Sequence, residues 1–366
     1  MKLLLVAGAR PNFMKVAPLM KAIHAHNSKR EDGNGRIDCI LVHTGQHYDE
    51  RMSGIFFAEL QIPPPDINLQ VGSGTHAVQT ANVMAKFEPI CEKQKPDWLV
   101  VVGDVNSTLA CTLVASKLGV KVAHLEAGLR SFDRTMPEEI NRIVTDALAD
   151  LLLTPSADAD ENLKKEGIAP TKIRLVGNIM IDSLIANLAQ AHRDNIIARL
   201  GLKKKNFIYV TLHRPSNVDS AASLANIMRV LGRVAERVPI VFPMHPRTRK
   251  MLAQGGIAVS NECRLHLLEP ISYHESLCLT ENARSVLTDS GGLQEESTFF
   301  HTPCLTLRAN TERPVTIRVG SNRLTSVTEL ESAVEQILKG PKRCGKIPPL
   351  WDGKTAERTV HSLLNG

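Results

Sequence analysis

A polar turn that could bind phosphate lies in the segment SVLTDSGGLQEESTFF, residues 285–300. An apolar run ends there in polar residues, Gly291 and Gly292 follow, and helix-forming residues come next, so the pattern predicts a strand, a tight turn and a helix. Glycines let backbone N–H groups approach a ligand, and a helix N-terminus attracts anions. One turn later, Glu295 and Glu296 could accept hydrogen bonds from ribose hydroxyls. The segment therefore suggests a nucleotide site, although an ordinary strand-to-helix turn would carry the same residue types.

Carboxylates follow two other apolar runs of the chain. In WLVVVGDVNST a buried-type strand leads to Asp104, and in KVAHLEAGLRS the next strand leads to Glu126. The loop and helix beyond carry Glu138 and Glu139. Because the carboxyl ends of parallel strands meet at one edge of a sheet, these acids are expected on one rim, where they could transfer protons. Helix caps or salt bridges at the rim are the alternative interpretation.

Cations and histidines occupy similar positions at predicted strand ends. Arg10 and Lys15 flank the turn GARPNF after the first strand, at the positive end of a predicted helix dipole, and this placement needs an anion. In the second half, His213 and Arg214 follow one strand in NFIYVTLHRPSN, and His245 follows another in IVFPMHPRT. Single histidines are more often packing or solvent residues, but two at successive strand ends favour a binding site.

Strands and helices alternate along the chain, and the strands are nearly continuous apolar runs, which is typical of parallel-sheet α/β domains. We predict two Rossmann-like domains that face each other across a cleft. The first would comprise residues 1–177 and be completed by a C-terminal helix over 354–366, and the second would comprise 178–353. A long helix over 179–200 is expected to bridge the two halves. Ligands bind outside the carboxyl ends of such strands, where the residues above are expected.

Composition is that of a globular protein with no sign of a nucleic-acid or membrane partner. The 366 residues carry a formal net charge of +6, but Lys and Arg are scattered and aromatic residues are few. The short apolar N-terminal run predicts a first strand rather than a membrane or export segment. Seven widely spaced cysteines form no zinc or disulfide pattern, so a reducing, cytoplasmic location is expected. Because no metal or cofactor motif occurs, we expect the anion to be held without either.

Eight motifs occur in order along nearly the whole chain: GARPNFMKVAPL, TGQHYD, VVGDVNST, HLEAGLRS, MPEEINR, LHRPSNVD, LTDSGGLQEES and NTERPVT. Together they resemble the non-hydrolysing UDP-N-acetylglucosamine 2-epimerases, whose fold is the two-domain glycosyltransferase-B arrangement. The resemblance implies that UDP and the sugar are bound by Arg10, Lys15, Ile271, Tyr273, Ser290, Gly291, Gly292, Glu296 and Arg313. It implies that the groups acting on the sugar are Asp104, Glu126, Glu138 and His213.

The resemblance implies reversible epimerisation at C2 of UDP-N-acetylglucosamine, which gives UDP-N-acetylmannosamine as a precursor of surface polysaccharide. The C2 proton becomes acidic only as the C1–O bond to UDP breaks, so we expect elimination to 2-acetamidoglucal and re-addition of UDP, without a cofactor. It also implies a homodimer and activation by the UDP-sugar at a second site. The candidates for that site are Gln46, His47, Glu139, Arg214 and His245.

Two positions depart from the family pattern. Asn12 follows Pro11 where many members have glutamate, and this departure is expected to alter sugar specificity. Ser276 stands where an aromatic residue is often found beside the base, which affects the expected packing of the uracil.

Other functions fit the same residues. A glycosyltransferase of this fold would transfer the sugar to an acceptor, although the carboxylate-rich sugar site favours epimerisation. Within the family, the substrate could be a diacetamido uronic acid derivative, or a hydrolysing form could release free N-acetylmannosamine. A non-enzymatic sensor would bind the UDP-sugar without turnover.

Overall fold

The computed structural model describes residues 1–30, 35–45, 63–255, 264–340 and 345–366. Within these ranges the chain divides into two compact units. Unit 1 comprises Met1–Ser183 and Pro349–Gly366, and unit 2 comprises Leu184–Pro348. The sequence predicted boundaries after residue 177 and before residue 354, which lie a few residues from the boundaries of these two units.

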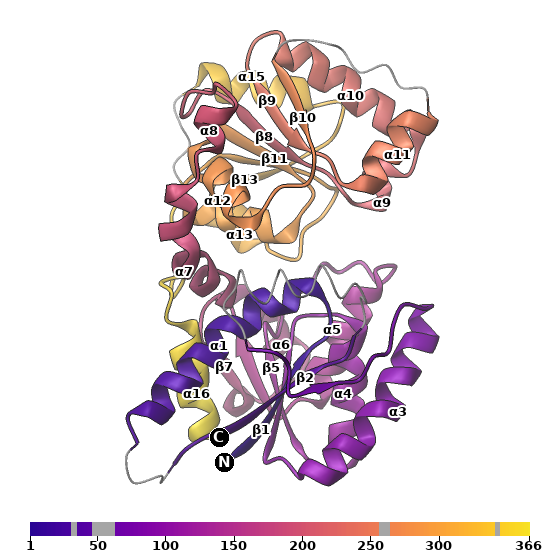
Figure 1. The fold of residues 1–366 in the computed structure, drawn as a ribbon, viewed down its shortest axis with the longest axis vertical. Coiled ribbons are helices and arrows are strands. Elements are labelled where there is room, and N and C mark those ends of the chain that lie inside the picture. Colours follow the sequence, from indigo (N-terminus) through magenta and orange to yellow (C-terminus); the bar gives the residue numbers. More distant parts are fainter. Residues whose placement is uncertain (31–34, 46–62, 256–263, 341–344) are drawn as a thin grey trace. The chain divides into compact units, whose positions relative to one another are not determined.

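Unit 1 is built on a seven-stranded parallel sheet, sheet A, in the order β3-β2-β1-β4-β5-β6-β7. Helices lie on both faces of this sheet (Figure 1). Its described elements are β1 (Lys2–Ala7), α1 (Arg10–Ser28), β2 (Asp38–His43), β3 (Ile67–Asn68), α3 (His76–Gln94), β4 (Trp98–Val102), α4 (Asn106–Lys117), β5 (Lys121–Leu125), α5 (Pro137–Leu148), β6 (Leu151–Thr154), α6 (Ala157–Lys165), a 3-10 turn (Pro170–Lys172), β7 (Ile173–Leu175), α7 (Ile179–Arg193), which runs on into unit 2, and α16 (Thr355–Leu364).

Unit 2 is built on a six-stranded parallel sheet, sheet B, in the order β10-β9-β8-β11-β12-β13. The prediction of two parallel α/β sheets is therefore confirmed. The described elements of unit 2 are α8 (Ile196–Arg199), β8 (Ile208–Thr211), α9 (Pro215–Val218), α10 (Ala221–Ala235), β9 (Ile240–Pro243), α11 (Pro246–Gln254), β10 (Leu265–Leu268), α12 (Tyr273–Asn282), β11 (Ser285–Thr288), α13 (Gly291–Phe299), β12 (Cys304–Leu307), α14 (Val315–Arg318), β13 (Asn322–Thr325) and α15 (Leu330–Lys339).

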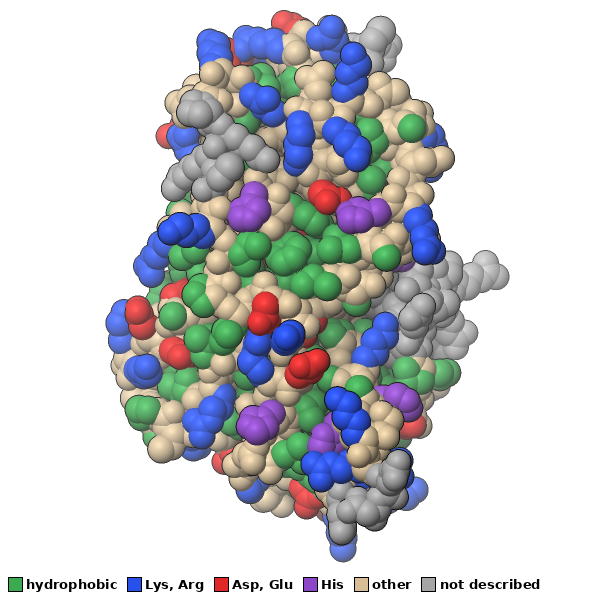
Figure 2. All heavy atoms as spheres, turned by 90° about the vertical axis from the view of Figure 1, so that its left-hand side faces the viewer, with side chains coloured by type: hydrophobic (Ala, Val, Ile, Leu, Met, Phe, Trp, Pro, Cys, Tyr) green, Lys and Arg blue, Asp and Glu red, His purple; other side chains and the backbone are tan. Residues whose placement is uncertain are grey.

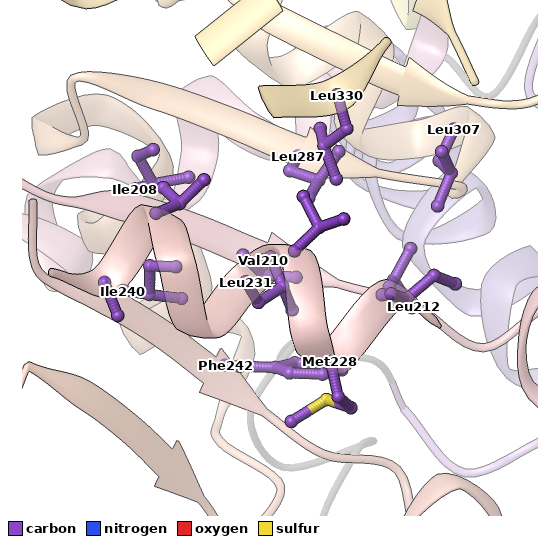
Figure 3. Packing of buried hydrophobic residues seen from close by; sticks show 14 of the residues in the cluster. Ile208, Val210, Leu212, Met228, Leu231, Ile240, Phe242, Leu287, Leu307 and Leu330 are labelled. Carbon is purple, nitrogen blue, oxygen red and sulfur yellow. The ribbon is translucent and has the colours of Figure 1, made fainter. Parts of the chain in front are cut away.

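The core of unit 2 shows why its strands are apolar almost throughout. Ile208 and Val210 of β8 pack on one face of sheet B with Met228 and Leu231 of α10, as Figure 3 shows. Tyr209, one position along the same strand, belongs to the apolar cluster on the other face. Successive side chains of a strand point to opposite faces, so a sheet covered by helices on both sides needs apolar residues at every position.

The prediction of one long helix over residues 179–200 is wrong. The chain leaves the helical conformation after α7 and starts again at α8. A carboxylate oxygen of Asp194 accepts a hydrogen bond from the backbone N–H of Ile196, 2.8 Å away. Aspartate near a helix start competes with the continuous helix by satisfying a free N–H group, which accounts for the break.

The segment over residues 349–366 is anchored in unit 1. Helix α16 packs against α1. The carboxylate of Asp182 accepts hydrogen bonds from the backbone N–H groups of Thr355 and Ala356, at 3.1 and 2.8 Å. The indole N–H of Trp351 donates to the carbonyl oxygen of Pro155. These contacts make the segment part of the first folded unit.

No helix in the described part of the chain is long and apolar enough to cross a membrane. On the face that Figure 2 shows, Lys and Arg side chains are scattered among acidic, polar and apolar ones and do not merge into a continuous basic surface. Dispersed charges of this kind are typical of a solvated protein surface.

Candidate functional site

Glu126 and Lys15 form a buried ion pair at the carboxyl edge of sheet A. Glu126 follows β5 and is 4% exposed, and the ammonium of Lys15, from the first turns of α1, binds its Oε2 atom. The other oxygen, Oε1, is buried without a hydrogen-bond partner among the described residues. The backbone of Glu126 lies in the left-handed region at φ 73°. A strained residue with an unsatisfied buried oxygen is typical of a functional position.

Asp104 and Glu139 share one arginine at the same edge. Arg142 of α5 donates from Nη1 to Asp104 Oδ2 at 2.5 Å and from Nη2 to Glu139 Oε2 at 2.6 Å. Glu139 also accepts hydrogen bonds from the N–H groups of Ser131 and Phe132. Burial alone would raise the pKa of Glu139, but the hydrogen bonds from Ser131 and Arg142 lower it below its usual value. Glu139, a candidate for a second ligand site, is thus an internal anchor of the loop before α5.

The remaining candidates of unit 1 are one exposed residue and three whose side chains lie outside the described part of the structure. Glu138, in the first turn of α5, is exposed. Arg10 opens α1, but its side chain lies outside the described part of the structure. Gln46 and His47 also lie outside the described residues.

Asn12, which departs from the family pattern, is buried and holds the first turn together. Its side-chain oxygen accepts hydrogen bonds from the N–H groups of Gly8 and Ala9, and its amide nitrogen donates to the carbonyl oxygen of Val102 on β4. The residue therefore links the turns after β1 and β4. This gives Asn12 a structural role next to the candidate sugar site.

Asp289 is the hydrogen-bonding centre of the carboxyl edge of sheet B. It follows β11 directly and is fully buried. Its carboxylate accepts hydrogen bonds from the N–H of Arg214 at 3.0 Å and the amide of Asn217 at 2.9 Å. Its Oδ1 lies 2.9 Å from Nδ1 of His213, whose side chain is 51% exposed. Burial alone would raise the pKa of Asp289, but His213 and Asn217 hold it below its usual value.

The geometry at Asp289 assigns a role to each nitrogen of His213. An ionised carboxylate can only accept, so Nδ1 carries the proton that faces Asp289. The other nitrogen, Nε2, has no partner among the described residues. A buried carboxylate that orients an exposed imidazole in this way is the arrangement found in general acid–base sites.

Arg214 and His245 have contacts that tie them to the protein itself. Arg214 donates from Nε to the carbonyl oxygen of Asp289 at 3.0 Å. Nδ1 of His245 accepts a hydrogen bond from the N–H of Arg247 and so caps α11. Burial, together with the charges of His213 and Arg247, lowers the pKa of His245.

The SGG turn lies against a network of buried ion pairs. Arg313 binds Glu295 through Nε at 2.7 Å and Glu312 through Nη1 at 2.5 Å. Burial opposes ionisation of Glu312, but Arg313 and Arg308 hold its pKa far below the usual value. A Cβ atom on Gly291 would lie only 2.7 Å from Nη1 of Arg313. Glycine at position 291 therefore allows the guanidinium to approach the first turn of α13.

Glu296 behaves differently from its neighbour Glu295. Tyr273 donates from its hydroxyl to Glu296 Oε1 at 3.2 Å. Burial and the negative charge of Glu295 raise the pKa of Glu296 to about 8, against the opposing effect of the Tyr273 hydrogen bond. The carboxyl group is therefore largely protonated at neutral pH before any ligand binds.

The other predicted UDP ligands lie at the same edge of sheet B. Ser290 is the residue that precedes α13, and a Cβ atom on Gly292 would meet nothing closer than Oγ of Ser290 at 4.0 Å. Ile271, in the loop after β10, packs against the apolar cluster below. Ser276, the second departure from the family pattern, shares a hydrogen bond of 2.8 Å with the hydroxyl of Tyr209.

Sequence reasoning assigned no role to Asp289 or Arg142. Asp289 is a carboxylate that directly follows an apolar strand, which is the signal that singled out Asp104 and Glu126, so the same argument could have found it. Arg142 carries no such signal, because its position on α5 becomes informative only once α5 lies beside the end of β4.

Comparisons with known proteins identify the family. Residues 29–364 match the family model described as UDP-N-acetylglucosamine 2-epimerase. A UDP-N-acetylglucosamine 2-epimerase of Methanocaldococcus jannaschii is 43% identical over the full length of both chains. A UDP-2,3-diacetamido-2,3-dideoxy-D-glucuronate 2-epimerase of Pseudomonas aeruginosa is 42% identical over 100% of this chain and 99% of its own.

A solved structure agrees with these sequence relatives. The crystal structure of the M. jannaschii UDP-GlcNAc 2-epimerase in complex with UDP-GlcNAc and UDP matches with a TM-score of 0.88 and 42% identity, over 100% of each chain. The chain belongs to the UDP-N-acetylglucosamine 2-epimerase family.

Proposed function

We propose that the protein inverts C2 of UDP-N-acetylglucosamine reversibly, which gives UDP-N-acetylmannosamine. Glu126 is the observation that carries this proposal. Its carboxylate is buried, is fixed at one oxygen by Lys15, and keeps the other oxygen without a partner in the described part of the chain. A group prepared in this way can accept a proton or a sugar hydroxyl without first breaking an internal hydrogen bond.

The reaction proceeds by elimination and re-addition. A carboxylate removes the proton at C2, the C1–O bond breaks with its electron pair leaving on the β-phosphate of UDP, and a C1–C2 double bond forms in 2-acetamidoglucal. UDP then adds back to C1 while an acid delivers a proton to the opposite face of C2. Asp104, Glu126 and Glu138 supply the base, the acid and stabilisation of positive charge at C1. Arg142 supports this role because its guanidinium binds Asp104 and fixes the position of that carboxyl group.

Unit 2 supplies the groups that hold UDP in this proposal. The N–H groups at Ser290, Gly291 and Gly292 bind phosphate at the N-terminus of α13. Glu296 accepts the ribose hydroxyls once it has lost its proton, and the backbone near Ile271 and Tyr273 binds uracil. Arg313, together with Arg10 of unit 1, stabilises the negative charge of the departing UDP, and His213 does so once its exposed nitrogen has accepted a proton.

A second candidate substrate is the UDP-activated 2,3-diacetamido uronic acid. The relative named for that sugar is 42% identical, almost the same as the relative named for UDP-N-acetylglucosamine. The two substrates share the reacting C1 and C2 positions, so the same carboxylates would serve both. They differ in the group at C3 and in the carboxylate at C6.

Proton NMR in D2O, with no added metal or nucleotide cofactor, tests the reaction and the substrate together. We expect UDP-N-acetylglucosamine to give UDP-N-acetylmannosamine with deuterium at C2. Turnover of the uronate alone would select the second candidate, and free N-acetylmannosamine would indicate a hydrolysing enzyme. Binding of both sugars with no deuterium incorporation would refute the epimerase proposal.

We also propose that the enzyme works as a homodimer that feeds surface polysaccharide synthesis, because the family resemblance implies these features, and that it is cytoplasmic, because its cysteines form no disulfide pattern. Activation by UDP-N-acetylglucosamine at a second site is part of the same proposal. Arg214 and His245 remain its candidates in the described structure, while Glu139 is better suited to anchoring its own loop. A dimer mass from light scattering would support the homodimer, and a sigmoidal dependence of the rate on substrate concentration would support activation at a second site.

A further inference from the structure

A cavity of about 410 Å³ lies in unit 2 on the edge of sheet B away from the SGG turn. Its walls come from Lys205, which precedes β8, Arg284, which precedes β11, the start of β12, and Arg323 at the start of β13, with α15 on one side. These positions place it at the amino ends of the parallel strands, whereas Ser290 follows the carboxyl end of β11. Cavities of this volume accommodate small organic ligands.

The lining combines an apolar floor with three cations. Pro303, Leu305, Ala333 and Ile337 supply apolar surface. The cationic side chains are Lys205, Arg284 and Arg323, and no aspartate or glutamate occurs among the lining residues that the structure describes. A concave apolar surface with a few polar groups is the usual form of a small-molecule site.

The hydrogen bonds found for the two arginines go to neutral oxygen atoms. Arg284 donates from Nη2 to the carbonyl oxygens of Ile337 and Leu338, at 3.2 and 3.1 Å, and so also caps the end of α15. Arg323 donates to the side-chain oxygen of Gln336 at 2.8 Å. These acceptors satisfy hydrogen bonds but supply no full negative charge. The cavity is therefore an electropositive pocket with apolar walls.

We propose that this cavity binds a small organic anion that has an apolar body and a carboxylate, sulfonate or phosphate head. The body would lie against Leu305, Ala333 and Ile337, and the head would bind Arg323 and its neighbouring cations. Such a ligand matches both halves of the lining, whereas inorganic phosphate alone would leave the apolar surface exposed to water. The site is separate from the UDP site, because β11 runs between them, and it does not depend on the proposed reaction.

Calorimetric titration with naphthalene-2-sulfonate tests the proposal on the full chain. We expect saturable binding of one molecule per chain that saturating UDP does not displace. Naphthalene-2-methanol has the same body without charge and should bind at least about tenfold more weakly, the effect of losing a charge-assisted hydrogen bond. Inorganic sulfate, which has the head without the body, should also bind weakly.

Arg323→Glu should weaken binding of naphthalene-2-sulfonate by about tenfold or more, because it reverses a charge at the pocket. Arg229→Glu is the matched control: Arg229 is also an exposed arginine that donates to a side-chain amide, that of Asn226, but it does not line the cavity. Lys205→Gln provides a second test if Arg323→Glu lowers the thermal transition. No saturable binding, displacement by UDP, or equal weakening by Arg229→Glu would overturn the proposal.

Discussion

The substitution Asp289→Asn tests whether the buried carboxylate sets the proton position on His213. Two of the groups that donate hydrogen bonds to Asp289, the N–H of Arg214 and the amide of Asn217, face its Oδ2 atom at 3.0 and 2.9 Å. An asparagine keeps these two bonds by placing its amide oxygen there. Its NH2 group then takes the place of Oδ1, 2.9 Å from Nδ1 of His213. Two donors cannot face each other, so the ring proton moves to Nε2.

The expected loss follows from the bond that is removed. A hydrogen bond to a buried charged group contributes about 2 kcal/mol, which corresponds to about 30-fold in rate. The change of tautomer adds to this figure, because Nε2 loses its ability to accept a proton; the corresponding change in the serine protease triad lowers kcat by about 10⁴-fold. We therefore expect kcat to fall between these limits. UDP affinity should change by only a few fold, since the other ligands of UDP stay in place.

Deuterium exchange at C2 of the UDP-sugar, followed by NMR, measures kcat, and ¹⁵N NMR of the imidazole reports the tautomer. Asp219→Asn is the control, because Asp219 is a surface aspartate in the same region that pairs with Arg247. A folded Asp289→Asn variant with kcat within threefold of wild type, or with the proton still on Nδ1, would refute the reasoning.

Three further predictions concern the two carboxyl edges. Gly291→Ala should lower UDP affinity at least about tenfold, because its Cβ would lie 2.7 Å from a buried guanidinium. Gly74→Ala is the calorimetric control, because its Cβ would meet nothing closer than Val78 at 3.5 Å. Lys15→Met should destabilise the protein by about 3 kcal/mol in urea unfolding, and adding Glu126→Gln should restore stability but not activity. UDP affinity should rise with pH through about 8, where Glu296 loses its proton, and Glu296→Gln should abolish this rise; a flat wild-type profile would contradict it.

The sequence indicated where functional side chains lie more reliably than what they contact. Polar residues after apolar strands pointed to Asp104, Glu126 and His213, because parallel strands place their carboxyl ends on one edge. The partners were not predictable in the same way. Lys15 and Glu126 are 111 positions apart, and their contact depends on how α1 lies over the end of β5. Sequence spacing carries no information of that kind.

The break between α7 and α8 illustrates a second limit. Apolar spacing continues through residues 179–200, so periodicity alone favours one helix. The outcome depends on Asp194, whose side chain satisfies the N–H of Ile196 and competes with helix continuation. A local hydrogen bond of this type contributes about 1 kcal/mol, which is enough to outweigh the helical preference of two or three residues.

The anchoring of residues 349–366 in unit 1 has a consequence for synthesis on the ribosome. Unit 2 is one continuous stretch, Leu184–Pro348, and can fold as soon as it emerges. Unit 1 reaches the exit tunnel first but still lacks the segment that covers α1 and binds Asp182. Unit 1 is therefore synthesised first but completed last. Until residues 349–366 have been made, chaperones can bind the surface of unit 1 that this segment later covers.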